Sequence, residues 1–247
     1  MTTTVRPATR SDPQVKTTSE ATSEATSGAT SGATSGPASV PLIDMGFTPE
    51  PFPANTHMCY IFNDEAERRE VIARYTNSGI TGEELVGYFA DLDNADLVDT
   101  YLASMGIHPP DDTHRDHVIF CPAHTVYCPE GHFAARDMIR RLKDLHRTCQ
   151  EHHCVNLRVT GEMSWALSPD ITGVEELVEY ESRLNLLMET HPLTAICQYD
   201  ANRFDGATLF EILQVHPMMV VRGQIVRNPY YIPPLAFLAH HGLPLDD

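Results

Sequence analysis

Short apolar runs alternate with longer amphipathic segments from residue 57 onward. The apolar runs have the length and the aromatic and β-branched content of buried strands, and they cover 57–63, 84–91, 117–121, 156–163 and 193–200. Apolar residues three or four positions apart predict helices over 64–79, 94–106, 133–152, 173–190 and 208–216, followed by a short hairpin. Strands that alternate with helices predict an α/β fold, a single three-layer domain with a mostly parallel sheet.

The first 50 residues differ from the rest of the chain because they hold mainly Thr, Ser, Ala, Gly and Pro. From Thr18 a four-residue period runs T-S-E-A, T-S-E-A, T-S-G-A, T-S-G-A, T-S-G-P. Such a segment buries too little apolar surface to offset its conformational entropy. We therefore expect a disordered arm over 1–50, acting as a linker, a tether or a phosphorylated tract, and a folded domain over 51–247.

Charge and composition narrow the possible partners. The formal net charge of −17 argues against direct nucleic-acid binding, which needs basic surface to neutralise phosphates. The sequence has no apolar run long enough to span a membrane and no visible signal peptide. The six cysteines are then expected to stay reduced in the cytoplasm.

The turn after the first predicted strand excludes the commonest nucleotide sites. A phosphate loop needs glycines and a lysine, whereas this turn reads F-N-D-E-A-E-R-R and carries carboxylates where a phosphate would lie. Neither a nucleophile elbow nor an H-E-x-x-H motif occurs in the sequence. We therefore expect a non-catalytic protein that needs no cofactor.

Several motifs in succession resemble one family. These are H-M-C-Y-I-F-N-D, S-G-I-T-G-E-E-L-V-G-Y-F-A-D, L-R-V-T-G-E-M-S-W-A-L, E-Y-E-S-R-L-N, C-Q-Y-D and H-P-M-M-V-V-R-G, followed by R-N-P-Y-Y-I-P-P. Together they resemble the MEDS domain of methanogens, methylotrophs and a dichloromethane-responsive regulator. The resemblance implies a RecA/KaiC-like fold without a phosphate loop. It also implies a sensory module for a simple hydrocarbon or one-carbon derivative, here stand-alone, with a signalling or transcription partner; a homodimer stays open.

Candidate ligand-binding residues follow from strand ends, where parallel sheets bind ligands, and from the motifs. Trp165 beside Glu162 is expected to form the wall of a pocket. His57 and Cys59 alternate with Met58 and Tyr60 and are expected to face opposite sides of the sheet. The full predicted set is His57, Tyr60, Asn63, Glu162, Trp165, Tyr180, Glu181, Asn185, Tyr199 and Asp200.

A segment rich in Cys and His leaves two further functions open. Cys121, His124, Cys128 and His132 are spaced by three or four residues, which suits zinc ligands without matching a standard finger. A metal-binding redox sensor or metalloenzyme, with zinc or iron, is therefore the first alternative, although we assign no metal ligand. The second alternative is a structural interaction domain with a vestigial pocket.

Overall fold

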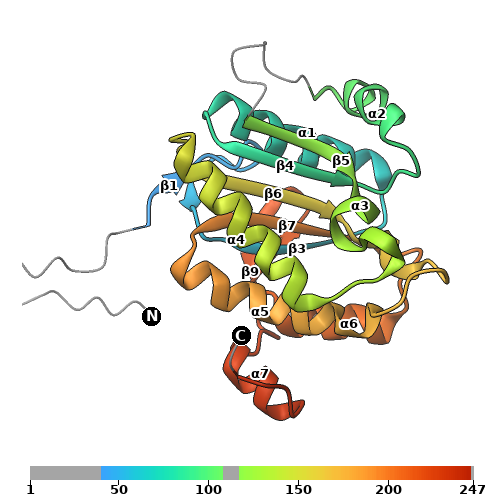
Figure 1. Cartoon of the computed structure of the whole chain (residues 1–247). Coiled ribbons are helices and arrows are strands. Elements are labelled where there is room, and N and C mark those ends of the chain that lie inside the picture. The colour runs from blue at the N-terminus through green and yellow to red at the C-terminus, as the bar shows by residue number, and fades with distance from the viewer. Residues whose placement is uncertain (1–39, 108–116, 246–247) are drawn as a thin grey trace, which may run out of the picture. The chain divides into compact units, whose positions relative to one another are not determined.

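The computed structural model describes residues 40–107 and 117–245, and residues 1–39 of the predicted arm lie outside this range (Figure 1). The strands are β1 (Leu42–Ile43), β2 (Phe52–Pro53), β3 (His57–Phe62), β4 (Leu85–Ala90), β5 (Val118–Pro122), β6 (Leu157–Glu162), β7 (Leu193–Asp200), β8 (Met218–Val221) and β9 (Gln224–Arg227). The α-helices are α1 (Glu65–Thr81), α2 (Val98–Ser104), α3 (Ala123–Tyr127), α4 (Ala135–Glu151), α5 (Leu177–Thr190), α6 (Gly206–Val215) and α7 (Pro234–His240). Each predicted strand and helix is present, with ends shifted by a few residues.

The main sheet has the strand order β5-β4-β6-β7-β3-β8-β9. Every neighbouring pair is parallel except β8 and β9, which form the predicted antiparallel hairpin. The central strands are buried on both faces, since β7 is buried from Leu193 to Tyr199. This burial explains their nearly continuous apolar sequence and confirms a mostly parallel sheet.

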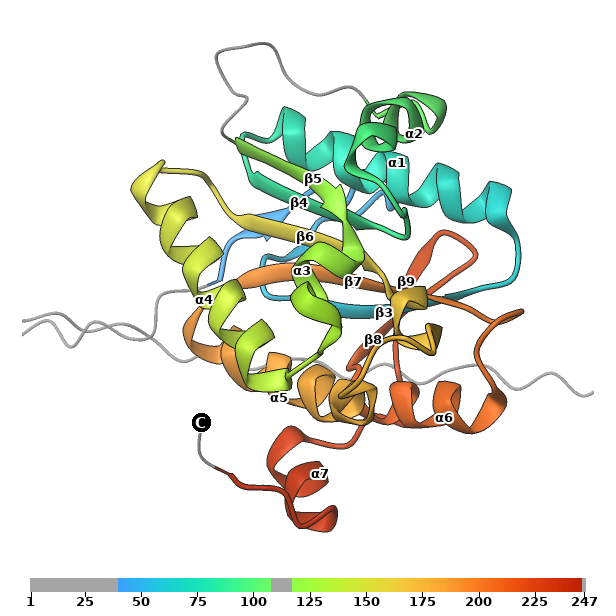
Figure 2. The same ribbon diagram turned by 45° about the vertical axis from the view of Figure 1, so that its right-hand side comes forward.

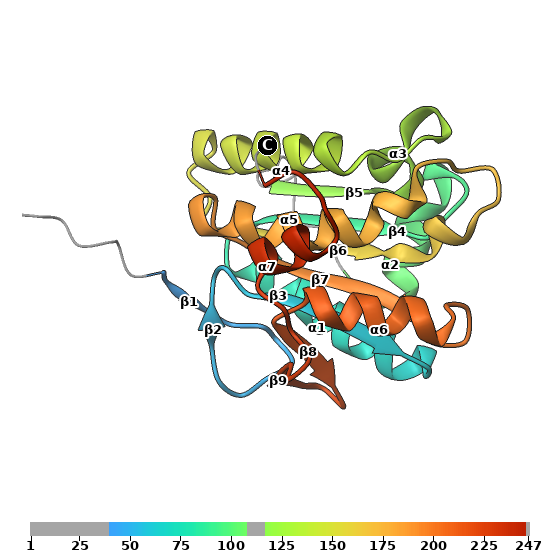
Figure 3. The ribbon, with the colours of Figure 1, turned by 90° about the horizontal axis from the view of Figure 1, so that it is seen from below.

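Helices cover both faces of the sheet, which gives three layers (Figure 3). Helices α4, α5 and α6 enclose one apolar core, whereas α1 and α2 enclose a second core on the other face. Side chains alternate along β3 as predicted: Cys59 lies in the first core, and Met58 and Tyr60 lie in the second. None of the described helices has the length and apolar character needed to cross a membrane.

Helix α1 begins at a carboxylate cap. Oδ1 of Asp64 accepts hydrogen bonds from the backbone N–H groups of Ala66 (2.8 Å) and Glu67 (3.1 Å). These are the donors that a helix N-terminus would otherwise offer to a bound phosphate. The predicted loss of a phosphate site at this turn therefore agrees with the local structure.

The folded domain begins earlier than predicted. Ile43 is 7% exposed and Met45 is fully buried, and both lie in the core beneath α1. The backbone carbonyl of Asp44 also accepts a 2.6 Å hydrogen bond from Nη2 of Arg158 in β6. The boundary at residue 50 was therefore wrong, because the apolar P-L-I-D-M segment inside the low-complexity region was assigned to the arm.

Candidate functional site

Four polar side chains converge between the sheet and α5. His57 comes from the start of β3, Cys197 from the middle of β7, Glu181 from α5, and His216 from the residue that follows α6. They are 1%, 3%, 0% and 0% exposed. Their potential ligand atoms all lie within 4.8 Å of one another. We call these four residues the buried centre.

The carboxylate of Glu181 is the focus of this centre. Its Oε2 lies 3.2 Å from Nε2 of His57, 3.4 Å from Sγ of Cys197 and 3.5 Å from Nε2 of His216. Its second oxygen, Oε1, accepts a 2.5 Å hydrogen bond from the hydroxyl of Tyr199. The carboxylate of Glu181 thus lies within 3.5 Å of one polar atom of each other member of the centre.

Outer hydrogen bonds hold the two imidazole rings in place. Nδ1 of His57 lies 3.1 Å from Oδ1 of Asn185, whose amide Nδ2 donates to the carbonyl of Val215 (2.8 Å). Nδ1 of His216 lies 2.8 Å from the backbone carbonyl of Ile212. Both rings therefore direct Nε2, and not Nδ1, toward Glu181.

Burial and neighbouring groups set the protonation states. Burial lowers the pKa of His216 to about 3, and the nearby His57 adds to this effect. Burial would raise the pKa of Glu181, but His216 and His57 outweigh it and hold that pKa below its usual value. Burial, reinforced by Glu181, raises the pKa values of Cys197 and Tyr199.

A separate polar network lies on the α1 face. Oε1 of Glu162 accepts hydrogen bonds from the hydroxyls of Tyr88 (2.6 Å) and Tyr101 (2.8 Å) and lies 3.2 Å from Nη1 of Arg68. The same Nη1 donates to Oε1 of Gln198 at 2.8 Å. This carboxylate is surrounded by donors, which is the pattern of a satisfied structural network.

A surface pocket of about 860 Å³ opens where β4 and β6 end. Its floor includes Trp165, a residue of the 3₁₀ segment Met163–Leu167 that is only 3% exposed and whose indole stacks on Tyr127 at 5.0 Å. Among the described residues the indole N–H has no acceptor. Helix α3 contacts the same segment (Figure 2). The lining also includes Asp91, Leu92, Asp93, His124, Thr125, Cys128, Glu130, Ser164, Leu167, Asp170, Ile171 and Arg203. We call this the Trp165 pocket.

Residues 56–217 match the sequence pattern of the family described as MEthanogen/methylotroph, DcmR Sensory domain, or MEDS. The matched range includes the whole buried centre and Trp165. The chain belongs to the MEDS family. It is also 31% identical over 81 residues to the transcriptional repressor DcmR of Methylorubrum extorquens, a match that spans 32% of this chain and 30% of the repressor. The description of the family indicates a sensory domain.

One solved structure confirms the predicted fold of this MEDS domain. A KaiC-like protein from Pyrococcus horikoshii superimposes with a TM-score of 0.52 at 14% identity, covering 73% of this chain and 79% of that chain. The flagellar accessory protein FlaH from Methanocaldococcus jannaschii gives a TM-score of 0.49 at 10% identity, with coverages of 75% and 84%. At such low identity the first likeness shows a KaiC-like, RecA-type fold and no more.

The predicted site residues of the MEDS domain do not form one site. His57, Glu181, Asn185 and Tyr199 meet at the buried centre. Asn63 and Asp200 lie at the ends of β3 and β7, where both contact the side chain of Asn202, at the backbone oxygen of Asn63 and at Oδ1 of Asp200. Tyr60 faces the α1 core, and Tyr180 packs edge-on against Phe133 and Tyr127.

The predicted pocket wall of Trp165 and Glu162 is right for Trp165 and wrong for Glu162. Trp165 lines the pocket, but Glu162 does not, because its side chain lies on the α1 face with Arg68. Glu162 is the last residue of β6, whereas Trp165 belongs to the 3₁₀ segment that follows the strand. Nearness in sequence at a strand end therefore did not mean a shared face.

The Cys/His segment does not form the suggested four-ligand metal site. His124 and Cys128 line the Trp165 pocket, whereas Nδ1 of His132 lies 2.9 Å from the hydroxyl of Thr172. Within residues 40–107 and 117–245, three or more potential ligands converge at the buried centre and not along this segment. Burial also raises the pKa of Cys128 to about 11 and raises that of Cys121, which disfavours a reactive thiolate.

Sequence reasoning missed two members of the buried centre. Cys197 and His216 belong to the C-Q-Y-D and H-P-M-M-V-V-R-G motifs, but neither is among the predicted site residues. One signal was available: Cys197 and Tyr199 are two apart on a strand and must share a face. The approach of His216 depends on the return of the chain after α6, which local sequence does not specify.

Proposed function

We propose that this MEDS domain is a non-catalytic sensor in which a small organic molecule, a simple hydrocarbon or one-carbon derivative, binds in the Trp165 pocket. The observation that carries the proposal is the pocket itself, with a volume of about 860 Å³ and a nearly buried indole in its lining. This volume lies in the usual range for small-molecule sites. Binding would shift a two-state equilibrium that a signalling or transcription partner senses.

The chemistry of the lining suggests what the guest contains. Leu92, Leu167 and Ile171 add apolar surface to the indole of Trp165, and His124, Thr125 and Ser164 add polar groups to the same lining, which favours an apolar guest with a small polar group. Arg203 is engaged with Asp91 at 2.7 Å. A halogenated or oxygenated small hydrocarbon meets these requirements.

Two observations support binding without catalysis. The described lining residues do not include a nucleophile that is hydrogen-bonded to a base, the minimum for activated nucleophilic chemistry. The carboxylate cap of Asp64 also occupies the helix N-terminus at the turn where a phosphate loop would lie.

All six cysteines are free thiols, which agrees with the cytoplasm as the place of action.

Tryptophan fluorescence tests the proposal directly because Trp165 is the single tryptophan of the chain. We expect halogenated and oxygenated one- to few-carbon compounds to change its emission and to raise the melting temperature. A ligand at about 100 times its dissociation constant contributes about 2.7 kcal/mol. For a domain of this size, that is a shift of roughly 5–10 °C.

A pair of matched variants locates the binding site. Leu167→Arg places a charge in the pocket, whereas Leu235→Arg changes a comparably exposed leucine on α7, outside the pocket. We expect only the first change to abolish the ligand-induced shift. Equal responses from both variants, or no response from the unaltered protein to any compound, would contradict the proposal.

A further inference from the structure

The hydrogen bonds around the buried centre fix which nitrogen of each imidazole carries a proton. Nδ1 of His216 faces a backbone carbonyl, an acceptor only, so Nδ1 must be the protonated nitrogen. Nδ1 of His57 faces Oδ1 of Asn185, whose amide nitrogen is already directed at the Val215 carbonyl, so it too donates. When neutral, both rings then present the lone pair of Nε2 toward Glu181.

This arrangement brings acceptors together without enough donors. The Nε2 atoms of both rings approach Oε2 of Glu181, which is itself an acceptor. Among the described residues, Nε2 of His216 has no hydrogen-bond partner although the residue is fully buried. The thiol of Cys197 can supply only one proton. A proton on Nε2 of His57 would pair that ring with Glu181 but would leave Nε2 of His216 without a partner, whereas a metal ion among these atoms would satisfy all of them in a dry interior.

The spacing fits a tetrahedral ion. Zinc binds nitrogen and oxygen at about 2.0–2.2 Å and sulfur at about 2.3 Å, so the ligand atoms of a tetrahedron lie roughly 3.3–3.7 Å apart. Oε2 of Glu181 is 3.2 Å, 3.4 Å and 3.5 Å from the three other atoms, and Sγ of Cys197 is 3.6 Å from Nε2 of His57. Four of the six distances among these atoms thus match the tetrahedral spacing, and the other two are at most 4.8 Å.

Charge and outer contacts fit as well. A carboxylate and a thiolate neutralise a divalent ion, and two neutral imidazoles complete the set with nitrogen and sulfur donors that suit zinc better than calcium or magnesium. Metal-bound histidines usually donate their other nitrogen to a carbonyl or a similar acceptor, as both rings do here. On binding, the Cys197 thiol would lose its proton to solvent while the Sγ–metal bond forms.

We propose that His57, Glu181, Cys197 and His216 bind one divalent transition-metal ion of the zinc class in a closed, structural site. The ion ties β3, β7, α5 and the end of α6 together, beneath α5 and apart from the Trp165 pocket. This metal site does not depend on ligand binding in the Trp165 pocket, so either proposal can fail while the other holds. Four protein ligands without an open position indicate a structural and not a catalytic role.

The test measures metal in the full-length protein. We expect close to one zinc per chain after purification or after loading of the chelated protein with zinc alone. Cobalt loading should produce a thiolate-to-cobalt charge-transfer band together with ligand-field absorption of tetrahedral intensity. A protein that takes up no zinc and whose melting temperature does not respond to a chelator would overturn the proposal.

Matched thiol variants identify the ligand. Cys197→Ala should lose the charge-transfer band, whereas Cys59→Ala should keep it, although Cys59 is a buried thiol paired directly with Cys197 across β3 and β7. The reverse pattern, or a cobalt complex without a thiolate band in the unaltered chain, would show a different site and contradict the assignment. Should Cys197→Ala not fold, the stoichiometry and cobalt spectrum of the unaltered chain still decide.

Discussion

Two buried carboxylates, Glu84 beside α1 and Glu181 beside α5, are surrounded in different ways. Oε2 of Glu84 accepts hydrogen bonds from Nε of Arg158 (3.1 Å) and from the amide of Asn156 (2.9 Å), and its other oxygen pairs with Nη2 of Arg158. All of these partners are N–H donors, and one carries a positive charge. Glu84 therefore has a complete set of protein partners.

Glu181 has a different environment at the same depth. Tyr199 donates to one oxygen, but the other faces two imidazole nitrogens and one thiol. The comparison teaches that burial of a carboxylate is not itself a sign of a site. What distinguishes Glu181 is that two of its neighbours are imidazole nitrogens, which carry lone pairs when the rings are neutral, whereas every neighbour of Glu84 is an N–H donor.

We expect the largest loss of stability from removing Glu84 from its ion pair with Arg158. Glu84→Ala leaves the guanidinium of Arg158, which is 0% exposed, without its carboxylate and should lower the free energy of unfolding by about 3–5 kcal/mol. Urea denaturation measures this loss. Glu70→Ala, which removes a surface partner of Arg74, is the control and should cost about 1 kcal/mol or less. Equal losses from the two variants would mean that the buried pair is not the stronger one.

The next prediction compares how a chelator changes the stability of variants at Glu84 and at Glu181. Removal of the proposed ion from the unaltered chain should lower stability by a few kcal/mol, since a bound ion at about 100 times its dissociation constant contributes about 2.7 kcal/mol. Glu84→Gln should keep this chelator response, and Glu181→Gln should lose most of it. Melting curves with and without chelator measure both, and a response retained by Glu181→Gln would exclude its role as a ligand.

Glu162 is a third carboxylate for this comparison, and we expect its replacement to lower the free energy of unfolding by less. Glu162 accepts from two tyrosine hydroxyls and pairs with Arg68, and its side chain is 13% exposed. Glu162→Gln should lower the free energy of unfolding by about 1–3 kcal/mol because charged acceptors are replaced by neutral ones. Its chelator response should equal that of the unaltered chain. A lost response would link this network to the metal.

The smallest effect concerns thiol reactivity in the Trp165 pocket. Burial raises the pKa of Cys128 to about 11, so at pH 8 only about 0.1% of it is thiolate. Alkylation followed by mass spectrometry should therefore be slow, and its rate should rise about tenfold for each pH unit toward 11. A fast reaction at pH 7 would indicate a low pKa and would revive the redox-sensor alternative.

Much of the fold could be predicted because it rests on local pattern. The runs at 57–63 and 193–200 specify buried strands by length and apolar content, and Asp64 specifies the start of α1 as a cap. The P-L-I-D-M segment was misassigned because its burial depends on α1 and on Arg158, which are remote in sequence. Helix α3, five residues long, is too short for a periodic signal.

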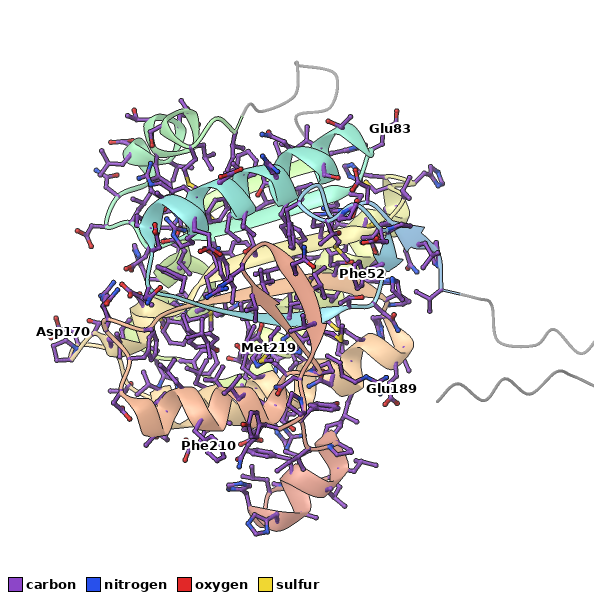
Figure 4. All side chains as sticks on the ribbon, turned by 180° about the vertical axis from the view of Figure 1, so that it is seen from behind. Phe52, Glu83, Asp170, Glu189, Phe210 and Met219 are labelled. Carbon is purple, nitrogen blue, oxygen red and sulfur yellow. The ribbon has the colours of Figure 1, made fainter. Side chains whose placement is uncertain are left out.

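The candidate site was predictable only in part. His57, Glu181 and Tyr199 were identified from motifs, but their common location follows from β3 pairing with β7 beneath α5. The strand order places β3 next to β7, so that residue 57 lies two positions from the β3 partner of residue 197, and no local rule specifies that order. The Trp165 pocket and the start of β3 lie at opposite ends of the strands. In Figure 4, Asp170, which lines the pocket, lies at one end, and Phe52, which precedes His57 in the chain, lies at the other.

The most direct measurement is anomalous X-ray diffraction from crystals of the zinc-loaded protein, with data collected on both sides of the zinc absorption edge. We expect one anomalous peak at the point enclosed by Nε2 of His57, Oε2 of Glu181, Sγ of Cys197 and Nε2 of His216, with bonds of about 2.0–2.3 Å. A peak elsewhere, or an interior in which Glu181 and the two imidazoles share only protons, would contradict the proposed metal centre.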